Sequence, residues 1–208
     1  MRTLFVVTHT ESVHHVEGRV GGWYDTELTA EGRRDAEVVA ECLMERVQGQ
    51  NAEVFSSNLL RAAQTADAIS TKLGVKTILM PALREMSYGV AEGQPQAWLN
   101  ARQTPAPHDN RLDHRSGIEN GETRRELASR IYGAVDEIQA RPCKTQIIVT
   151  HSFALTFVVT AWIKMPLESV GYVNFRVGPG SITHLQEDEF WMSRVVASLG
   201  EKVALVRD

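Results

Sequence analysis

Cysteine is scarce in this sequence, and long apolar runs are absent. The two cysteines, Cys42 and Cys143, lie far apart and form no Cys-x-x-Cys motif. This pattern argues against a disulfide-stapled fold, and we interpret both residues as free thiols in a reducing compartment, with a single bridge as the alternative. No apolar run reaches the roughly 18 residues of a membrane span, and the amino-terminal apolar stretch is too short for a signal peptide. The sequence therefore predicts a cytoplasmic protein without a membrane partner.

Positive charge is also in short supply. The chain has 22 lysines and arginines against 26 acidic residues, which gives a net charge of −4. This balance provides no overall attraction for nucleic acid, so any anion must be bound in a local pocket. The hydrophobic content of 43% is typical of globular proteins. The length predicts one domain over residues 1–208. The sequence leaves the oligomeric state open, with a dimer as one option.

Short apolar runs alternate with amphipathic segments along the chain. We expect strands at 3–8, 52–56, 75–80 and 146–150, and helices at 29–47, 58–73, 123–139 and 153–163. Residues 181–187 and 190–198 are expected to form a closing hairpin joined by Asp188-Glu189. The stretch 81–121 is predicted to be irregular, as a lid or specificity element. This alternation predicts an α/β fold, namely a three-layer α/β/α sandwich with a mixed, mostly parallel sheet.

Two Thr-His pairs, each at the end of an apolar run, are the most informative feature. His9 follows the first predicted strand, and His151 follows the strand at 146–150. Because ligands bind at the carboxyl ends of strands in open α/β sheets, the two histidines are expected to share one site. Arg61 lies at the start of a predicted helix, where arginine and the helix terminus both favour an anion. Phosphate is the anion that this combination fits best.

Several motifs then recur in a consistent order along the whole chain. They lie at residues 19–25, 28–32, 57–66, 83–89, 92–93, 121–123 and 149–151. At these positions the sequence resembles the histidine phosphatase superfamily, in its phosphoglycerate mutase-like branch. The resemblance implies the phosphoglycerate mutase-like fold and the hydrolysis of a small phosphomonoester without a metal or organic cofactor.

The resemblance also implies a role for individual residues. His9 would be the nucleophile that forms a phosphohistidine, and Glu85 would be the general acid. Arg61 and His151 would bind and stabilise the phosphoryl group. Six further residues are expected to contact phosphate or substrate, namely Thr8, Thr10, His15, Arg19, Gly22 and Ser152.

The first motif departs from the family pattern Arg-His-Gly, which here is Thr8-His9-Thr10. Two other departures are His15 in place of asparagine and Ser152 in place of glycine. A lost charge-assisted hydrogen bond of about 1.5–3 kcal/mol predicts turnover that is about 10–100-fold slower. A protonated His15, His14 or Arg19 would replace part of the missing positive charge.

Three alternatives to the phosphatase remain at this point. The first is a catalytically impaired protein of the same fold that binds a phosphorylated ligand. The second is a phosphoglycerate mutase-like phosphotransferase. The third is a metal-dependent hydrolase, because zinc accepts such ligand types, here His9, Glu11, His14, His15 and His151, although their spacing matches no standard zinc motif.

Overall fold

A six-stranded sheet forms the centre of the computed structural model, which describes residues 1–47 and 49–203. The strand order is β3-β2-β4-β1-β5-β6. The first four strands in this order run parallel, and β5 is antiparallel to both of its neighbours. The predicted mixed, mostly parallel sheet is therefore confirmed. The strands are β1 (Arg2–Thr8), β2 (Ala52–Ser56), β3 (Thr77–Leu79), β4 (Thr145–Thr150), β5 (Ser181–Glu187) and β6 (Arg194–Lys202).

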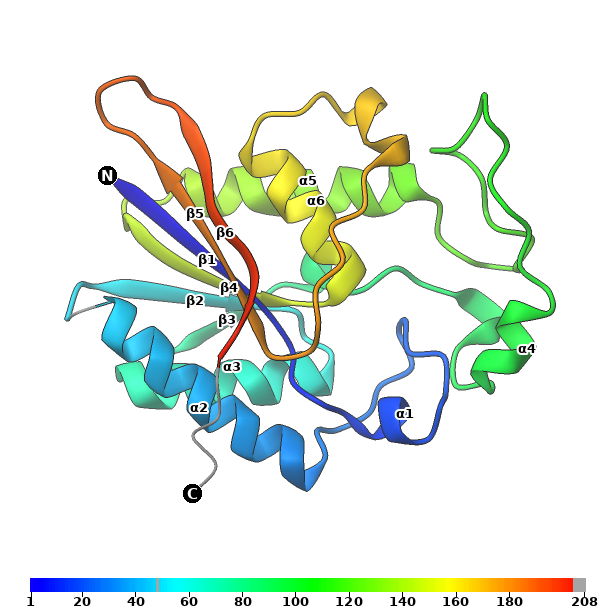
Figure 1. The fold of residues 1–208 in the computed structure, drawn as a ribbon, viewed down its shortest axis with the longest axis horizontal. Helices are drawn as coiled ribbons and strands as arrows, with labels where there is room; N and C mark the ends of the chain where they lie inside the picture. The colour runs from blue at the N-terminus through cyan, green and yellow to red at the C-terminus, as the bar shows by residue number, and fades with distance from the viewer. Residues whose placement is uncertain (48, 204–208) are drawn as a thin grey trace.

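Helices cover both faces of the sheet, which gives the three layers (Figure 1). Helices α2 (Ala30–Val47) and α3 (Leu60–Leu73) pack on one face, and α5 (Arg124–Gln139) and α6 (Ser152–Trp162) pack on the other. Successive side chains of a strand point to opposite faces, so both faces of β1 must be apolar. Phe5 packs in the apolar cluster on the side of α2 and α3, whereas Leu4 packs in the cluster on the side of α5 and α6. The three-layer prediction is thus confirmed.

Local sequence signals explain where several helices begin and end. The backbone N–H of Gly32 donates to Oγ1 of Thr29, which caps the amino terminus of α2. Helix α5 begins with a reciprocal capping box between Thr123 and Glu126. Helix α3 ends at Gly74, which adopts a left-handed conformation with φ of 67°.

Some predicted boundaries are wrong. Strand β3 has three residues rather than six. The last hairpin is confirmed, but β6 begins at Arg194 because Asp188 builds a longer turn, in which its carboxylate accepts the backbone N–H of Phe190. Helix α1 (Val13–Val16) and the 3-10 helix η3 (Leu167–Tyr172) were not predicted.

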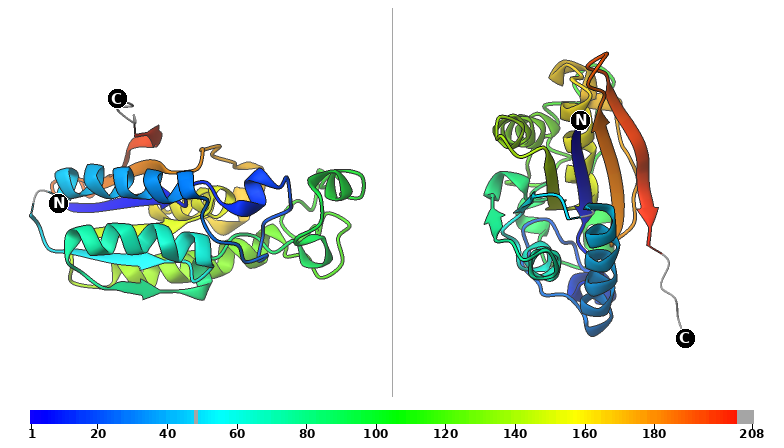
Figure 2. Two further views of the ribbon diagram at one scale, coloured as in Figure 1. Left: turned by 90° about the horizontal axis from the view of Figure 1, so that it is seen from below. Right: turned by 90° about the vertical axis from the view of Figure 1, so that its left-hand side faces the viewer.

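The stretch 81–121 extends beyond the end of the sheet (Figure 2). It contains the 3-10 helices η1 (Pro81–Leu83) and η2 (Gly89–Ala91) and helix α4 (Gln96–Asn100), so the prediction of a wholly irregular segment is wrong. A small apolar cluster of Val20, Ala91, Leu99 and Ile118 explains this order, because it gives the segment a core of its own.

Both cysteines are free thiols, as predicted. Within the described part of the chain, no helix is both long enough and apolar enough to cross a membrane.

Candidate active site

Strand register brings the two Thr-His pairs together. Thr8 of β1 lies opposite Thr150 of β4, and the backbone N–H of His9 donates to the carbonyl of Thr150 at 2.9 Å. The imidazole rings of His9 and His151 consequently lie 5.0 Å apart in an edge-on arrangement. The two neighbouring strand ends thus deliver both histidines to one place, as the sequence predicts.

His9 is held in one tautomer. Its Nδ1–H donates to the carbonyl of Thr10 at 2.8 Å, and a carbonyl can only accept. Its Nε2 accepts a hydrogen bond from Nε of Arg61 at 3.2 Å. Burial, together with the positive charge of Arg61, holds the pKa of His9 well below its usual range. His9 is therefore a neutral imidazole with a lone pair on Nε2.

Arg61 lies in the first turn of α3 and is only 1% exposed. Its Nη1 donates to the carbonyl of Tyr24 at 3.0 Å, and its Nη2 donates to the carbonyl of Gly22 at 2.7 Å. Each terminal nitrogen keeps a second hydrogen that is free to bind an anion. Gly22 has a left-handed φ of 57°, and its carbonyl orients Arg61. Gly22 also lines the pocket, so its predicted contact with phosphate stays a prediction.

Glu85 faces the amino terminus of α6. Its Oε2 accepts the backbone N–H of Phe153 at 3.0 Å, and its Oε1 accepts those of Ala154 at 3.1 Å and Met86 at 2.8 Å. Burial raises the pKa of Glu85, although the hydrogen bonds from Met86 and Phe153 oppose this rise. Indole Nε1 of Trp23 also donates to the Glu85 carbonyl, which fixes the backbone that carries the acid.

His151 precedes α6, and its Nε2 is hydrogen-bonded to Oγ of Ser57 at 2.9 Å. Its Nδ1 has no hydrogen-bond partner among the described residues. Burial and the charge of Arg61 hold the pKa of His151 well below its usual range. Ser152, the first residue of α6, lines the same pocket.

His14 and His15 also reach this pocket, and the ring of His15 stacks on His9 at 5.3 Å. Burial lowers the pKa of His14 to about 3, and it also lowers the pKa of His15. Both shifts favour the neutral imidazole near pH 7, which argues against these two side chains as the source of the missing positive charge. Arg19 lines the pocket too, but it donates to the Glu17 carboxylate and the Gly93 carbonyl.

Thr8 and Thr10 do not reach the pocket. The Thr8 hydroxyl donates to the Gly178 carbonyl at 2.7 Å, and Oγ1 of Thr10 donates to the Gly32 carbonyl at 2.6 Å. Both side chains are fully buried in these contacts. The expectation that their side chains contact phosphate is therefore corrected, since each hydroxyl is used to join loop segments.

The pocket has a volume of about 300 Å³ and is open to solvent. Three polar side chains of its lining, Tyr88, Gln96 and Gln103, were not singled out from the sequence. Tyr88 lies close to Glu85 in the chain, but no local pattern marks Gln96 or Gln103. Ser57, which orients His151, begins the 57–66 motif and could have been recognised there.

A metal-dependent hydrolase needs several ligand side chains gathered around one ion. Glu11 accepts a hydrogen bond from the Thr29 hydroxyl. In residues 1–47 and 49–203, no group of three His, Cys, Asp or Glu side chains is arranged to hold a metal ion.

The family comparison covers most of the chain. The model of the histidine phosphatase superfamily (branch 1) matches residues 4–196. A curated protein from Yersinia enterocolitica named "Probable phosphoglycerate mutase GpmB" is 30% identical, over 99% of this chain and 95% of its own length. A Yersinia pestis protein of the same name is 29% identical over the same shares.

Solved structures of similar proteins have the same fold. A mycobacterial glucosyl-3-phosphoglycerate phosphatase, solved with VO3, is 25% identical with a TM-score of 0.78, over 97% of this chain and 100% of its own. An alpha-ribazole phosphatase from Shigella flexneri has a TM-score of 0.79 over 99% of this chain and 100% of its own. At 24% identity, the second likeness concerns the fold alone.

Proposed function

We propose that this chain, which belongs to the histidine phosphatase superfamily, hydrolyses a small phosphomonoester through a phosphohistidine on His9. One observation carries the proposal: the Thr10 carbonyl holds the proton of His9 on Nδ1, so that Nε2 keeps a lone pair beside the Arg61 guanidinium. A neutral ring nitrogen next to a fixed positive charge is what attack on a phosphate ester needs.

In the first half-reaction, the Nε2 lone pair of His9 forms a bond to phosphorus, and the bond between phosphorus and the ester oxygen breaks. Glu85 gives its proton to the departing oxygen, a role that its raised pKa favours. The free N–H groups of Arg61 would stabilise the charge on the transferring oxygens. His151 adds a neutral polar group beside His9.

In the second half-reaction, water attacks the phosphohistidine. The carboxylate of Glu85 takes a proton from this water, and the bond between phosphorus and Nε2 breaks. Inorganic phosphate leaves, His9 regains its lone pair and Glu85 is again protonated. The residues present complete this cycle without a further co-reactant.

A second candidate is phosphoryl transfer of the mutase type. The name of the Yersinia relatives, "Probable phosphoglycerate mutase GpmB", favours it, because this chain matches them over 95% of their length. A mutase must keep water away from its phosphohistidine, so release of inorganic phosphate distinguishes the two candidates.

The test is turnover of a panel of phosphomonoesters with and without a chelator, with His9→Ala as the matched variant. Chelator-resistant release of phosphate that is lost in His9→Ala would support the proposal. Wild type quenched in alkaline denaturant should also retain a base-stable, acid-labile phosphoryl group that His9→Ala lacks. Equal turnover by wild type and His9→Ala would overturn the mechanism, and transfer without release of phosphate would favour the mutase.

A further inference from the structure

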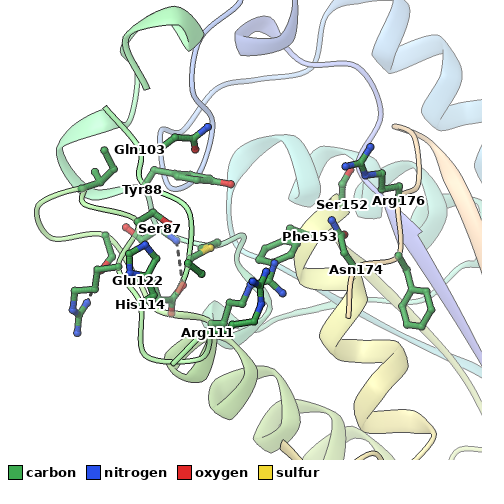
Figure 3. A pocket seen from close by; sticks show the side chains of 18 of the residues that line it. Ser87, Tyr88, Gln103, Arg111, His114, Glu122, Ser152, Phe153, Asn174 and Arg176 are labelled. Atoms are coloured by element: carbon green, nitrogen blue, oxygen red, sulfur yellow. Dashed lines mark hydrogen bonds between the residues drawn. The ribbon is translucent and has the colours of Figure 1, made fainter. Parts of the chain in front are cut away.

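A second cavity opens next to the histidine pocket. Its volume is about 510 Å³, which is in the range of small-molecule sites. Tyr88, Gln103 and Ser152 line both cavities, so the two are adjacent. Figure 3 shows the side chains that surround this second cavity. A phosphomonoester with its phosphoryl group at His9 would place its remaining atoms here.

Four arginines line the second cavity, and three of them have no acidic partner among the described residues. Arg111, Arg124 and Arg176 come from separate segments, and none forms an ion pair with a carboxylate of the described residues. Arg111 donates only Nε, to the carbonyl of Gly171, and Arg124 donates only Nη1, to the carbonyl of Val173. Most of their N–H groups are therefore available to a ligand.

The neighbouring acidic groups do not supply the missing counter-charge. Glu122 lines the cavity, but both of its oxygens accept hydrogen bonds from Arg130, at 2.7 and 2.8 Å. Arg115, also on the wall, is paired with Glu126. The cavity consequently has an excess of positive charge, although the chain as a whole is acidic.

Aromatic rings hold two of the guanidinium groups in place. Arg124 lies over the ring of Phe153 at 4.9 Å, and Arg111 lies over the ring of Tyr172 at 4.6 Å. Arg111 is close enough to Arg124 to help burial in lowering the pKa of Arg124. Two half-buried like charges without a counter-ion repel each other, and a bound anion would relieve this repulsion.

We propose that this second cavity binds an anionic group at the non-reacting end of the substrate. The substrate class is then a phosphomonoester that carries a second anion, either a carboxylate or a second phosphate. The inference rests on the proposed phosphatase function and narrows it. Arg111, Arg124 and Arg176 would be specificity-determining residues, because guanidinium groups bind planar carboxylates and phosphates in forked pairs.

The experiment compares esters that differ only in distal charge. The first matched pair is 4-carboxyphenyl phosphate and 4-carbamoylphenyl phosphate. The second, more flexible pair is 4-phosphooxybutanoate and its amide. A butane-1,4-diol bisphosphate distinguishes a second phosphate from a carboxylate. We expect wild type to favour an anionic member over its amide by about tenfold or more in kcat/KM, since a desolvated ionic hydrogen bond contributes at least that much.

Three variants locate the effect. Arg124→Gln should reduce the preference for the anion to about threefold or less, with little change for the amide. Arg176→Gln should also reduce it, and Arg176 is exposed and donates no hydrogen bond to a described residue, so the fold is not at stake. Arg125→Gln is the matched control, because Arg125 is the next residue of the same helix but is paired with Asp113.

The outcomes separate this inference from the proposed function. Hydrolysis of acids and amides at equal rates by wild type would overturn the inference and leave the phosphatase standing. A preference that persists in Arg124→Gln and Arg176→Gln would also overturn it. If no ester is hydrolysed, the esters serve as ligands in melting experiments. If the acid raises the melting temperature, the amide does not, and the effect is lost in Arg124→Gln, the anion site is supported while the phosphatase proposal fails. If acid and amide raise the melting temperature equally, the inference is overturned.

Discussion

Nε of Arg61 donates a hydrogen bond to Nε2 of His9 over 3.2 Å. The acceptor is the nitrogen that we propose as the nucleophile, so the same contact shows that its lone pair is not occupied by a proton. A phosphoryl group bound between the two side chains would exchange this contact for bonds to its own oxygens. The pair thus links the protonation state of His9 to the position of the positive charge in the site.

The pH dependence of turnover should reflect opposite pKa shifts at the two reacting groups. Burial lowers the pKa of His9, so the nucleophile stays neutral as the pH falls through 6, whereas burial raises the pKa of Glu85 and prolongs its protonated state. We expect kcat/KM for an alkyl phosphate to remain high in mild acid and to fall as the pH rises and Glu85 loses its proton. An acidic limb at the usual imidazole pKa would contradict the tautomer assigned to His9. The alkaline limb should disappear in Glu85→Gln, which controls for ionisation of the substrate.

Glu85→Gln should slow the enzyme according to the leaving group. The amide cannot protonate a departing oxygen, so we expect kcat for alkyl phosphates to fall by about 10²–10⁴-fold. The loss should be much smaller for 4-nitrophenyl phosphate, whose leaving group needs no proton. The measurement is kcat for a series of esters in both proteins. A uniform loss over the series would assign Glu85 to binding rather than to proton transfer.

Thr8→Val should affect stability but not catalysis. The Thr8 hydroxyl donates to the Gly178 carbonyl and contacts Oγ of Ser181 at 3.1 Å, and valine leaves both groups without this partner. We expect a loss of about 1–3 kcal/mol in the free energy of unfolding, measured by urea denaturation. The value of kcat/KM should stay within about twofold, since the side chain lies outside the pocket. A large fall in kcat/KM with unchanged stability would restore Thr8 to the phosphate site.

Two glycine-to-alanine changes in helices should have opposite effects. A Cβ atom at Gly32 would overlap the backbone carbonyl of Glu11, whereas a Cβ at Gly133 would meet nothing within 4 Å. Gly32→Ala should therefore lower the free energy of unfolding by about 2 kcal/mol or more, because backbone must move. Gly133→Ala, in the interior of α5, should raise it by about 0.5–1 kcal/mol. The measurement is the denaturant midpoint of the two variants and of wild type. An unchanged free energy of unfolding in Gly32→Ala would contradict the close approach of α2 to the loop after β1.

The layers of the fold could be predicted because their signals are local. The apolar runs of β1 and β4, the cap at Thr29 and the stop at Gly74 each act within a few residues. Short elements in 81–121 were missed, since their order depends on apolar contacts with Val20, which is far away in the chain.

The site could be predicted in part, for the same reason. The meeting of His9 and His151 follows from strand ends, which are visible in the sequence. The burial of Thr8 against Gly178 could not be predicted, because the partner is 170 residues away. Neither could the neutral state of His14, since a lowered pKa follows from burial and from neighbours such as His15.

The sequence by itself determined the order of strands and helices, the family motifs and the identity of the residues that could carry chemistry, since these depend on neighbours in the chain. Only the tertiary structure decided how those residues are used. It turned Thr8 and Thr10 away from the pocket, made Gly22 a support for Arg61, and gathered three arginines from distant segments beside the histidines. Where a side chain points, how deeply it is buried and which charges surround it all depend on packing. Packing brings together residues that no local sequence pattern connects.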